Sequence, residues 1–311
     1  MSLSTPRSAA APAIRTSLQR GRPDIAGLVF SAILLFSLLF SLAILAILIG
    51  DQLSRGMPVF AERGVDFLTS SLSSNPANAG IAQGIIGTAL LTAIVALIAF
   101  PIGILTAIYV EEYAPANLLT RFIDVNIRNL AGVPSVVYGL LGLAIFVTAF
   151  AALGVGNGRN VLSGGLTLAV LVLPLVIITS AEAIRSVPTS LREGGYGIGG
   201  SRWQVVRELV LPSAVPGILT GTVLALSRAL GETAPLIVIG AVLGSFSTSG
   251  SIADLFTGPY TALPVIVYDW ARKPQEEFRA LTSAAIIVLL AVTVLANTLA
   301  ILLRNRYERR W

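Results

Sequence analysis

The chain has 311 residues, of which 55% are hydrophobic and 12% are charged, and its mean hydropathy is +0.84. A soluble globular domain carries about 25% charged residues, so this composition places the chain in a lipid bilayer. The sequence contains no Cys and no His, which excludes disulfide scaffolds, thiolate zinc sites and every catalytic site that needs a cysteine or a histidine. We therefore expect no catalytic residues and no metal site.

The chain contains a single lysine, Lys273, within the sequence Ala-Arg-Lys-Pro. A P-loop that binds and hydrolyses ATP needs its lysine in the pattern G-x-x-x-x-G-K-[ST], where backbone N–H groups surround the phosphates. Lys273 does not lie in such a loop. We expect this chain to bind no cofactor itself, and any energy for work to come from another protein.

Long stretches without charge predict six membrane-spanning helices, because a helix needs about 20 apolar residues to cross roughly 30 Å of hydrocarbon. Only the fifth stretch contains charged residues, Arg228 and Glu232. The more polar stretches 51–80 and 244–279 are predicted to be loops, and no soluble domain is expected. The six predicted spans are Gly27–Gly50, Ile81–Val110, Asn129–Ala152, Val161–Thr179, Ser213–Leu243 and Ala280–Leu303.

The predicted domain organisation is that of one membrane domain with two short ends. Residues 1–26 have too little apolar content for a packed core and are expected to be a flexible cytoplasmic segment. Residues 27–303 are predicted to form the six-helix transmembrane domain, and residues 304–311 a basic cytoplasmic tail. The first apolar run is longer than the roughly 7 to 15 residues of a signal peptide, so we expect it to be retained as an anchor.

The distribution of arginine predicts the orientation, since cytoplasmic segments carry an excess of Lys and Arg. Both ends of the chain are basic, and an even number of spans places them on one side, so we expect both in the cytoplasm. One loop does not fit this orientation. The segment between the second and third spans would be cytoplasmic, yet it carries Glu111, Glu112 and Asp124 against Arg121 and Arg128.

The charged residues of the fifth span need an explanation, because an ionisable side chain at the centre of a membrane helix costs about 2.5 to 3.5 kcal/mol even on lenient scales. Arg228 and Glu232 stand at positions i and i+4, on one face of the expected helix, and can reach each other. We expect them to form, with Ser227 and Thr233, a polar point on a translocation path. The alternative is that the pair only neutralises itself between packed helices while Pro235 kinks the span.

An arginine on such a path narrows the class of solute. Its planar guanidinium matches tetrahedral oxyanions and carboxylates, and it keeps its charge inside a membrane. Glu232 would repel most anions, but it could accept a hydrogen bond from an oxyanion that still carries a proton, as phosphate does near neutral pH and sulfate does not. The pair therefore points toward phosphate.

The segment 180–212 between the fourth and fifth spans is expected to be cytoplasmic and to dock a partner protein. Ser190 can cap a short helix with Glu193 three residues later. Gly199 supplies a turn, and Ser201 can cap a second helix.

The second helix of this segment is predicted to be amphipathic. Trp203, Val206, Leu209 and Val210 share one face against charged residues on the other, and Pro212 is expected to close the helix before the next span. The alternative is an interfacial helix that lies on lipid headgroups.

This segment resembles the E-A-A-x3-G-x9-I-x-L-P loop of ATP-binding cassette (ABC) importer permeases. In that family the loop is the coupling helix, which seats in a cleft of a cytoplasmic ATPase. The chain has Gly194 and Gly195 where the family has two alanines, at about 0.8 to 1.0 kcal/mol of helix propensity each, and Leu209 where it has isoleucine. The first coupling helix is therefore expected to form fully only against the ATPase. The resemblance implies the coupling residues Glu193, Gly199, Trp203, Leu209, Leu211 and Pro212.

Within that superfamily the chain most resembles the PstA permeases of phosphate importers, from the second span onward. The ending Gly-Glu-Thr-Ala-Pro is similar to PstA rather than to the partner permease PstC. The segments that carry the resemblance are Ala-Gly-Val-Pro-Ser-Val-Val-Tyr-Gly-Leu from Ala131, Glu-Ala-Ile-Arg-Ser-Val-Pro from Glu182, Arg-Ala-Leu-Gly-Glu-Thr-Ala-Pro from Arg228 and Leu-Pro-Val-Ile-Val-Tyr-Asp-Trp-Ala from Leu263.

The resemblance implies an all-α, type I ABC importer permease with six transmembrane helices in the bacterial inner membrane. It also implies three kinds of partner: a PstC-like second permease, a PstB-like ATPase dimer that binds ATP and magnesium, and a PstS-like external phosphate-binding protein. We expect that binding protein to dock on the outer loops, especially Gly244–Arg279. No nucleic-acid partner is expected.

Other functions stay open on the residues alone. The same architecture could import sulfate, molybdate or an organic solute. A secondary transporter would use Arg228 and Glu232 with an ion gradient and need no ATPase. An intramembrane hydrolase is disfavoured by the absence of His and Cys, although an Asp-only or Ser-Lys site is not formally excluded.

Overall fold

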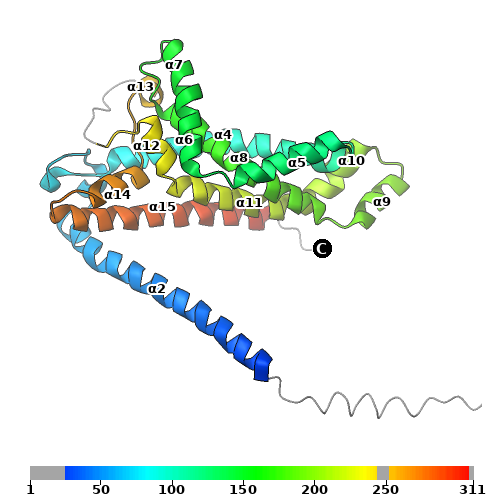
Figure 1. Cartoon of the computed structure of the whole chain (residues 1–311), viewed down its shortest axis with the longest axis horizontal. Coiled ribbons are helices and arrows are strands. Elements are labelled where there is room, and N and C mark those ends of the chain that lie inside the picture. The colour runs from blue at the N-terminus through cyan, green and yellow to red at the C-terminus, as the bar shows by residue number, and fades with distance from the viewer. Residues whose placement is uncertain (1–24, 244–251, 308–311) are drawn as a thin grey trace, which may run out of the picture. The chain divides into compact units, whose positions relative to one another are not determined.

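The computed structural model describes residues 25–243 and 252–307, and within these ranges the chain forms helices and no strand (Figure 1). The chain divides into two units, residues 1–51 and residues 52–311, which are described separately. In the first unit the described residues belong to α2 (Ile25–Arg63), which continues into the second unit.

The second unit contains the remaining helices, in which η1 is a 3-10 turn and η2, η3 and η4 are π turns. They are α3 (Asp66–Thr69), η1 (Pro76–Asn78), α4 (Ala82–Ile108), η2 (Tyr109–Tyr113), α5 (Leu118–Ala131), α6 (Ser135–Gly142), η3 (Leu143–Val147), α7 (Thr148–Ala152), α8 (Val161–Arg185), α9 (Thr189–Gly197), α10 (Arg202–Val205), η4 (Val206–Val210), α11 (Leu211–Gly231), α12 (Ala234–Ile239), α13 (Ile252–Thr257), α14 (Leu263–Ala271) and α15 (Glu277–Tyr307).

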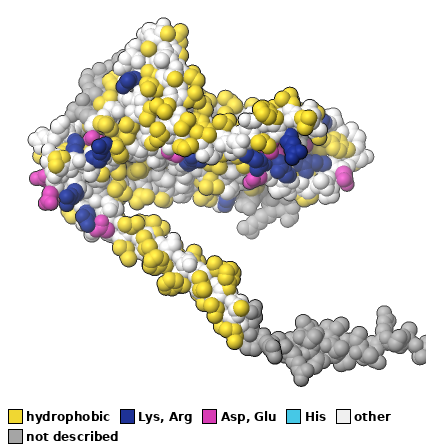
Figure 2. All heavy atoms as spheres, in the orientation of Figure 1, with side chains coloured by type: hydrophobic (Ala, Val, Ile, Leu, Met, Phe, Trp, Pro, Cys, Tyr) yellow, Lys and Arg dark blue, Asp and Glu magenta, His cyan; other side chains and the backbone are white. Residues whose placement is uncertain are grey.

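Six helical segments among the described residues are long and apolar enough to cross a membrane, which confirms the predicted number of spans. Such helices satisfy their backbone hydrogen bonds internally, as hydrocarbon requires. On the face drawn in Figure 2, most charged side chains of the second unit lie toward its two ends, with hydrophobic side chains between them. The six segments are Ile25–Arg63, Ala82–Tyr113, Ser135–Ala152, Val161–Arg185, Arg202–Gly231 and Glu277–Leu302.

Helix α8 is the centre of the second unit and packs against both α4 and α11 (Figure 1). Glycines make these contacts close. A Cβ atom added to Gly103 of α4 would lie 2.7 Å from Val176 of α8, and one added to Gly217 of α11 would lie 2.7 Å from Ala183. Small residues at helix contacts let membrane helices approach and pack.

Three of the predicted loops contain helix, and the one between the second and third spans contains α5. Helix α2 continues past residue 50 to Arg63, because Gly56 packs against the backbone of Ser283 and Ala284 in α15 and Val59 is buried. The predicted loop 244–279 contains α13 and α14, and α14 buries Trp270. Nine residues are too few to be recognised as a span, so the sequence pattern gave no signal for α14.

The third predicted span is also wrong at its start. Residues 129–131 complete the amphipathic helix α5, and the chain then turns at Gly132 before α6 begins at Ser135. Two glycines of α6 pack closely against neighbouring helices. A Cβ atom at Gly139 would lie 2.8 Å from the Cα of Pro235, and Gly142 is similarly close to Thr167.

Replacing Gly87 by alanine is expected to destabilise the protein, because a Cβ atom there would overlap the backbone carbonyl oxygen of Thr261. Overpacking of this kind costs about 1 to 3 kcal/mol. Gly194→Ala is the control, since nothing lies within 4 Å of a Cβ at that helical position and alanine favours helix by up to about 1 kcal/mol. Thermal unfolding of the two variants in detergent measures the difference, and equal melting temperatures would contradict the packing described.

Candidate functional site

The charged pair of the fifth span lies at a break in the helix. Helix α11 ends at Gly231, Glu232 has an extended backbone (φ −76°, ψ 121°), and α12 begins at Ala234. The prediction of one continuous helix over Ser213–Leu243 is therefore wrong. Pro235 has no N–H to donate to the Gly231 carbonyl, and its ring would clash with that carbonyl in a continuous helix.

Arg228 and Glu232 form an ion pair across this break. Arg228 Nε lies 3.2 Å from Glu232 Oε1, and the two side chains are 36% and 18% exposed. Arg228 stands in the last turn of α11, where the helix dipole favours a positive charge. The contact uses Nε, which leaves the two terminal guanidinium nitrogens without a hydrogen-bond partner among the described residues. The pair is thus formed, with part of the arginine still open to a further acceptor.

Ser227 and Thr233, the other two predicted translocation residues, flank the pair. Ser227 Oγ hydrogen-bonds Asn297 Oδ1 of α15 at 2.7 Å, and Thr233 is the partly buried residue before α12. Sequence reasoning missed Asn297. The sequence feature that could have revealed it is the amide of Asn297 inside an otherwise apolar span. In a membrane helix such an amide needs a hydrogen-bond partner on a neighbouring helix.

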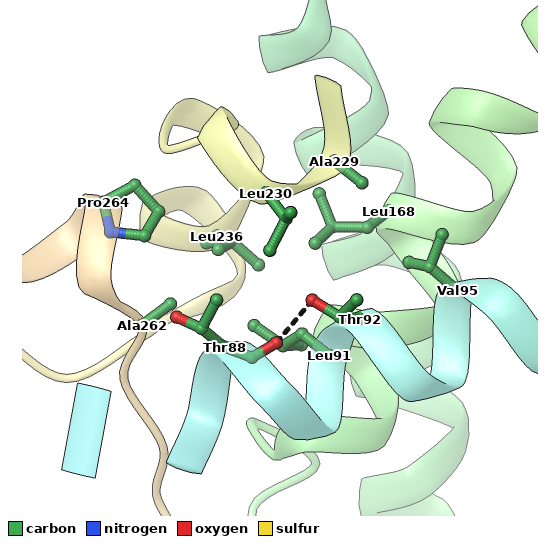
Figure 3. Close-up of a pocket in the computed structure, with 10 residues that line it drawn as sticks. All are labelled: Thr88, Leu91, Thr92, Val95, Leu168, Ala229, Leu230, Leu236, Ala262 and Pro264. Atoms are coloured by element: carbon green, nitrogen blue, oxygen red, sulfur yellow. Dashed lines mark hydrogen bonds between the residues drawn. The ribbon is translucent and has the colours of Figure 1, made fainter. Parts of the chain in front are cut away.

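A narrow pocket lies beside the end of α11 (Figure 3). Its two hydroxyl side chains already have partners: Thr92 donates to the Thr88 carbonyl at 2.6 Å, and Thr88 Oγ1 accepts from the Leu263 amide at 2.9 Å. The pocket has room for about one water molecule, so phosphate does not fit in it. Its lining residues are Thr88, Leu91, Thr92, Val95, Leu168, Ala229, Leu230, Leu236, Ala262 and Pro264.

The segment 180–212 folds into two short helices with a glycine turn, largely as predicted. Ser201 caps the second helix in a capping box with Gln204. Gly199 has φ +85°, a backbone conformation that favours glycine. The predicted cap at Ser190 is wrong, because α9 begins one residue earlier, after Pro188, and has no side-chain capping bond.

The buried face of the second helix differs from the prediction. Val206 and Val210 are buried and Leu209 is partly buried, but Trp203 is 57% exposed. The π turn η4 adds one residue to the helical turn and so shifts the register between Trp203 and the residues after it. Pro212 does not close the helix either: it lies in the first turn of α11, directly after that π turn, within one helical segment that runs to the end of α11.

The first coupling helix, α9, is formed in the chain alone, so the expectation that it needs the ATPase is wrong. Gly195 explains one of the two departures from alanine. A Cβ atom there would lie 2.8 Å from both Leu209 Cδ1 and Val205 Cγ2, whereas a Cβ at Gly194 would meet nothing within 4 Å. Glycine at position 195 therefore lets α9 pack closely against the second helix.

The predicted coupling residues divide into an exposed set and a packed set. Glu193, Gly199, Trp203 and Pro212 are exposed, while Leu209 and Leu211 are partly buried. The neighbouring side chains Tyr196 and Ile198 are also exposed. The coupling segment therefore exposes both a charged side chain, Glu193, and large apolar or aromatic ones, such as Trp203 and Ile198.

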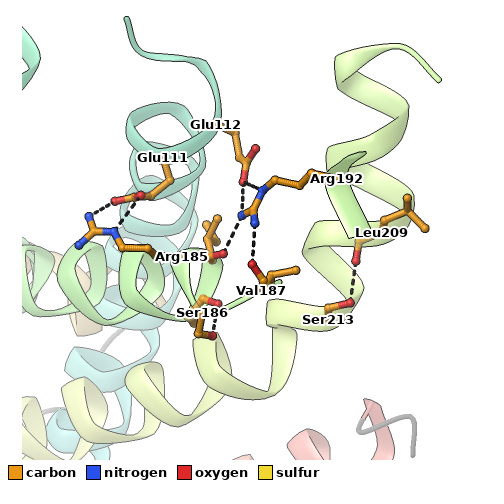
Figure 4. Close-up of polar contacts among 10 residues, drawn as sticks. Glu111, Glu112, Arg185, Ser186, Val187, Arg192, Leu209 and Ser213 are labelled. Atoms are coloured by element: carbon orange, nitrogen blue, oxygen red, sulfur yellow. Dashed lines mark hydrogen bonds and ion pairs between the residues drawn. The ribbon is translucent and has the colours of Figure 1, made fainter. Parts of the chain in front are cut away.

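Two glutamates of the segment that did not fit the charge bias form ion pairs with arginines near the coupling segment. Glu111 binds Arg185 at the end of α8, and Glu112 binds Arg192 of α9 (Figure 4). These contacts place the loop beside the coupling segment, which agrees with the prediction that both lie on one side of the membrane. The assignment of that side to the cytoplasm stays a prediction.

Comparison with known proteins places the chain among transporters. Residues 99–311 match the model of the binding-protein-dependent transport system inner membrane component. The chain belongs to this family. It is 34% identical over 247 residues to the phosphate transport system permease protein PstA of Yersinia pestis, which covers 76% of this chain and 79% of that protein. It is 38% identical over 219 residues to the probable ABC transporter permease protein YqgH of Bacillus subtilis, which covers 65% and 69%.

Solved structures share the fold. The bacterial ABC transporter involved in the import of the acidic polysaccharide alginate matches with a TM-score of 0.59 at 15% identity, over 90% of this chain and 99% of that chain. The MetNI methionine ABC transporter matches with a TM-score of 0.58 at 16% identity, over 74% and 96%. The chain is thus a PstA-like, type I ABC importer permease. It is a multi-pass plasma-membrane protein, a transport component that works with another permease, an ATPase and a substrate-binding protein.

The hydrogen bond between Ser227 and Asn297 is expected to tie α11 to α15. Ser227→Ala and Asn297→Leu should each destabilise the protein, and the double variant should lose less than the sum. The difference should be about 0.6 kcal/mol, the average for such bonds between membrane helices. Unfolding in mixed detergent micelles over the four proteins measures it, and strict additivity would show that the two side chains do not interact.

Proposed function

We propose that the chain is the PstA-type permease subunit of an ATP-driven importer of inorganic phosphate. The named relatives support the solute: besides the Yersinia protein, the phosphate transport system permease protein PstA 1 of Mycobacterium tuberculosis is 31% identical over 231 residues. The proposed partners are a PstC-like permease, a PstB-like ATPase dimer that binds ATP and magnesium, and a PstS-like phosphate-binding protein.

The observation that carries the proposal is the partly exposed ion pair between Arg228 and Glu232 at the break of the fifth span. A charged pair inside a membrane domain marks solute pathways and relays. Because this pair is open at the surface of the chain while the adjacent pocket holds about one water molecule, the proposed path runs between the two permeases.

The chemistry of the pair suits hydrogen phosphate. The terminal nitrogens of Arg228 can donate to two oxygens of a tetrahedral anion, and the carboxylate of Glu232 can accept a hydrogen bond from the O–H group that phosphate keeps near neutral pH. Ser227 and Thr233 are proposed to supply hydroxyl groups beside the path. Sulfate has no proton to offer at this pH, so Glu232 would disfavour it.

In the proposed cycle, the loaded binding protein docks on the outer segments between residues 244 and 279, of which 244–251 lie outside the described residues. Closure of the ATPase dimer on ATP pushes the coupling segment 180–212 and opens the spans outward, and hydrolysis resets them. The segment must contact the ATPase differently in the two states, because only a differential contact can couple them. The proposed contacts are Glu193, Gly199, Trp203, Leu209, Leu211 and Pro212.

Two alternative functions make different predictions. An importer of sulfate or molybdate would take up labelled phosphate poorly and would be inhibited by its own anion. An ion-coupled secondary transporter would accumulate solute in proteoliposomes that lack ATP. Uptake of labelled phosphate with competing oxyanions, with and without internal MgATP, separates both from the proposal.

Arg228→Ala is expected to reduce phosphate uptake by the reconstituted transporter about a hundredfold. It removes the donors that pair with the anion and leaves Glu232 as an unpaired charge that repels it, a loss of roughly 3 kcal/mol. Uptake of labelled phosphate and the phosphate-stimulated ATPase rate measure the effect. Arg128→Ala is the control, because Arg128 makes an exposed pair with Asp124 on α5. Wild-type uptake by the Arg228 variant would end the assignment of Arg228 to the path.

Gly199→Leu is expected to uncouple or release the ATPase. The residue has φ +85°, which costs a branched side chain about 1 to 2 kcal/mol and displaces the turn between the coupling helices. Gly64→Leu is the control, since Gly64 also has a positive φ and open space around its Cβ position. Co-purification of the ATPase and the ratio of uptake to hydrolysis are measured. A fully coupled Gly199 variant would show that this turn does not dock.

A further inference from the structure

Three consecutive residues at the end of the second span each contact one arginine of the coupling region. They lie in η2, the π turn that follows α4. The arginines come from three successive helices, α8, α9 and α10. We name this set of six residues the arginine clasp: Glu111 with Arg185, Glu112 with Arg192, and Tyr113 with Arg202.

Two of the three contacts of the clasp, Glu111 with Arg185 and Tyr113 with Arg202, lie at its two ends. Arg185 forms a two-point contact with Glu111, in which Nε lies 3.2 Å from Oε2 and Nη2 meets Oε1. Such paired contacts fix orientation as well as distance. The guanidinium carbon of Arg202 lies 5.1 Å from the centre of the Tyr113 ring, a cation–π contact. The clasp therefore reaches from the end of α8 to the start of α10.

The central contact of the clasp is buried. Glu112 has a side chain only 7% exposed, and Arg192 approaches its Oε1 with Nη2 at 2.7 Å and Nε at 3.1 Å. Arg192 also donates to the carbonyls of Val187 at 2.6 Å and Ile184 at 2.9 Å (Figure 4). One side chain thus joins η2, the end of α8 and the coupling helix α9. Removing one member of such a pair leaves a buried charge without its partner, so the contact resists separation.

The chain itself connects the coupling helices only to α8 and α11. Glu112, in the η2 turn that follows α4, is 80 residues from Arg192 in sequence. The chain therefore gives α4 no short covalent connection to the coupling segment. At its other end α4 carries Thr88 and Thr92, which line the narrow pocket beside the end of α11. A displacement of the coupling helices reaches α4 only through non-covalent contacts, which are the packing of α4 against α8 along the span and the contacts of η2 with α9 and α10.

We propose that the arginine clasp is the link that ties α4 to the coupling helices α9 and α10, so that α4 moves with them as one body when the ATPase closes. Glu112 and Arg192 are then positioning residues for energy coupling, acting through α4 and not through contact with the solute. The inference rests on the proposed ATP-driven function. It adds a third helix, α4, to the two that the chain connectivity already moves.

The first test is the coupling ratio in the complete reconstituted transporter, with its ATPase, second permease and phosphate-binding protein. Glu112→Gln keeps the size of the side chain and removes its charge. We expect the ATPase to remain bound, the stimulation of ATP hydrolysis by phosphate-loaded binding protein to fall about fivefold or more, and uptake per ATP to fall with it. Glu62→Gln is the matched control, because it makes the same change at an exposed carboxylate near the end of α2, outside the clasp.

The second test measures the joint movement directly. The chain has no Cys, so spin labels can be placed at Leu105→Cys on α4 and Ser190→Cys on α9 in a complex with cysteine-free partners. We expect the distance between the labels to stay the same with and without MgATP in the otherwise wild-type chain. With Glu112→Gln added, the distance should change with nucleotide.

The outcomes are distinguishable. If the wild-type complex does not import phosphate on ATP, the proposed function fails. If the wild-type complex is coupled and Glu112→Gln couples equally well, the clasp inference alone fails. If Glu112→Gln does not assemble, the label distance in the otherwise wild-type chain decides: a change with nucleotide overturns the inference, and a constant distance supports it.

Discussion

Close contact between helix backbones is the constraint on which this structure depends. Lipid is as apolar as the helices, so burial of apolar surface gives them little reason to associate, and van der Waals packing at short range takes its place. The second unit meets this requirement with glycines where α4 and α8 meet, such as Gly103 of α4 and Gly165 of α8. Van der Waals packing therefore holds α4 and α11 against α8. The polar contacts are available for positioning helix ends and for coupling.

Three sets of side-chain polar contacts lie at distinct places in the second unit. The pair of Arg228 and Glu232 lies where the fifth span breaks, the hydrogen bond of Ser227 to Asn297 joins that span to the last one, and the arginine clasp lies at the coupling end. The glutamates of the clasp explain why a loop can be acidic on a side expected to be basic: their charge is neutralised locally by arginines.

The sequence predicted the number of spans well, because membrane thickness sets the length of an apolar run. Features that depend on partners far along the chain escaped it. The continuation of α2 to Arg63 follows from packing against α15, and the contact of Glu112 with Arg192 joins residues 80 positions apart. The exposure of Trp203 follows from the π turn η4. A search for the regular 3.6-residue period of an α-helix cannot detect such a turn.

The candidate site was predicted in part for the same reasons. Charge inside an apolar run is visible in sequence, so Arg228 and Glu232 were found, and their ion pair was expected from the spacing. The break between them was not, because Pro235 was read as a kink within a helix and the structure uses it to begin a new one. Asn297 was missed because it is polar without being charged.

Helix α14 has a consequence for how the chain is threaded through the membrane. Its nine residues rise about 13.5 Å, less than half of the roughly 30 Å of hydrocarbon, so it cannot cross. The Thr88 hydroxyl of α4 accepts a hydrogen bond from the amide of Leu263, the first residue of α14. A helix of this length adds no crossing, so the number of membrane crossings stays even although the segment between the last two spans contains apolar helix.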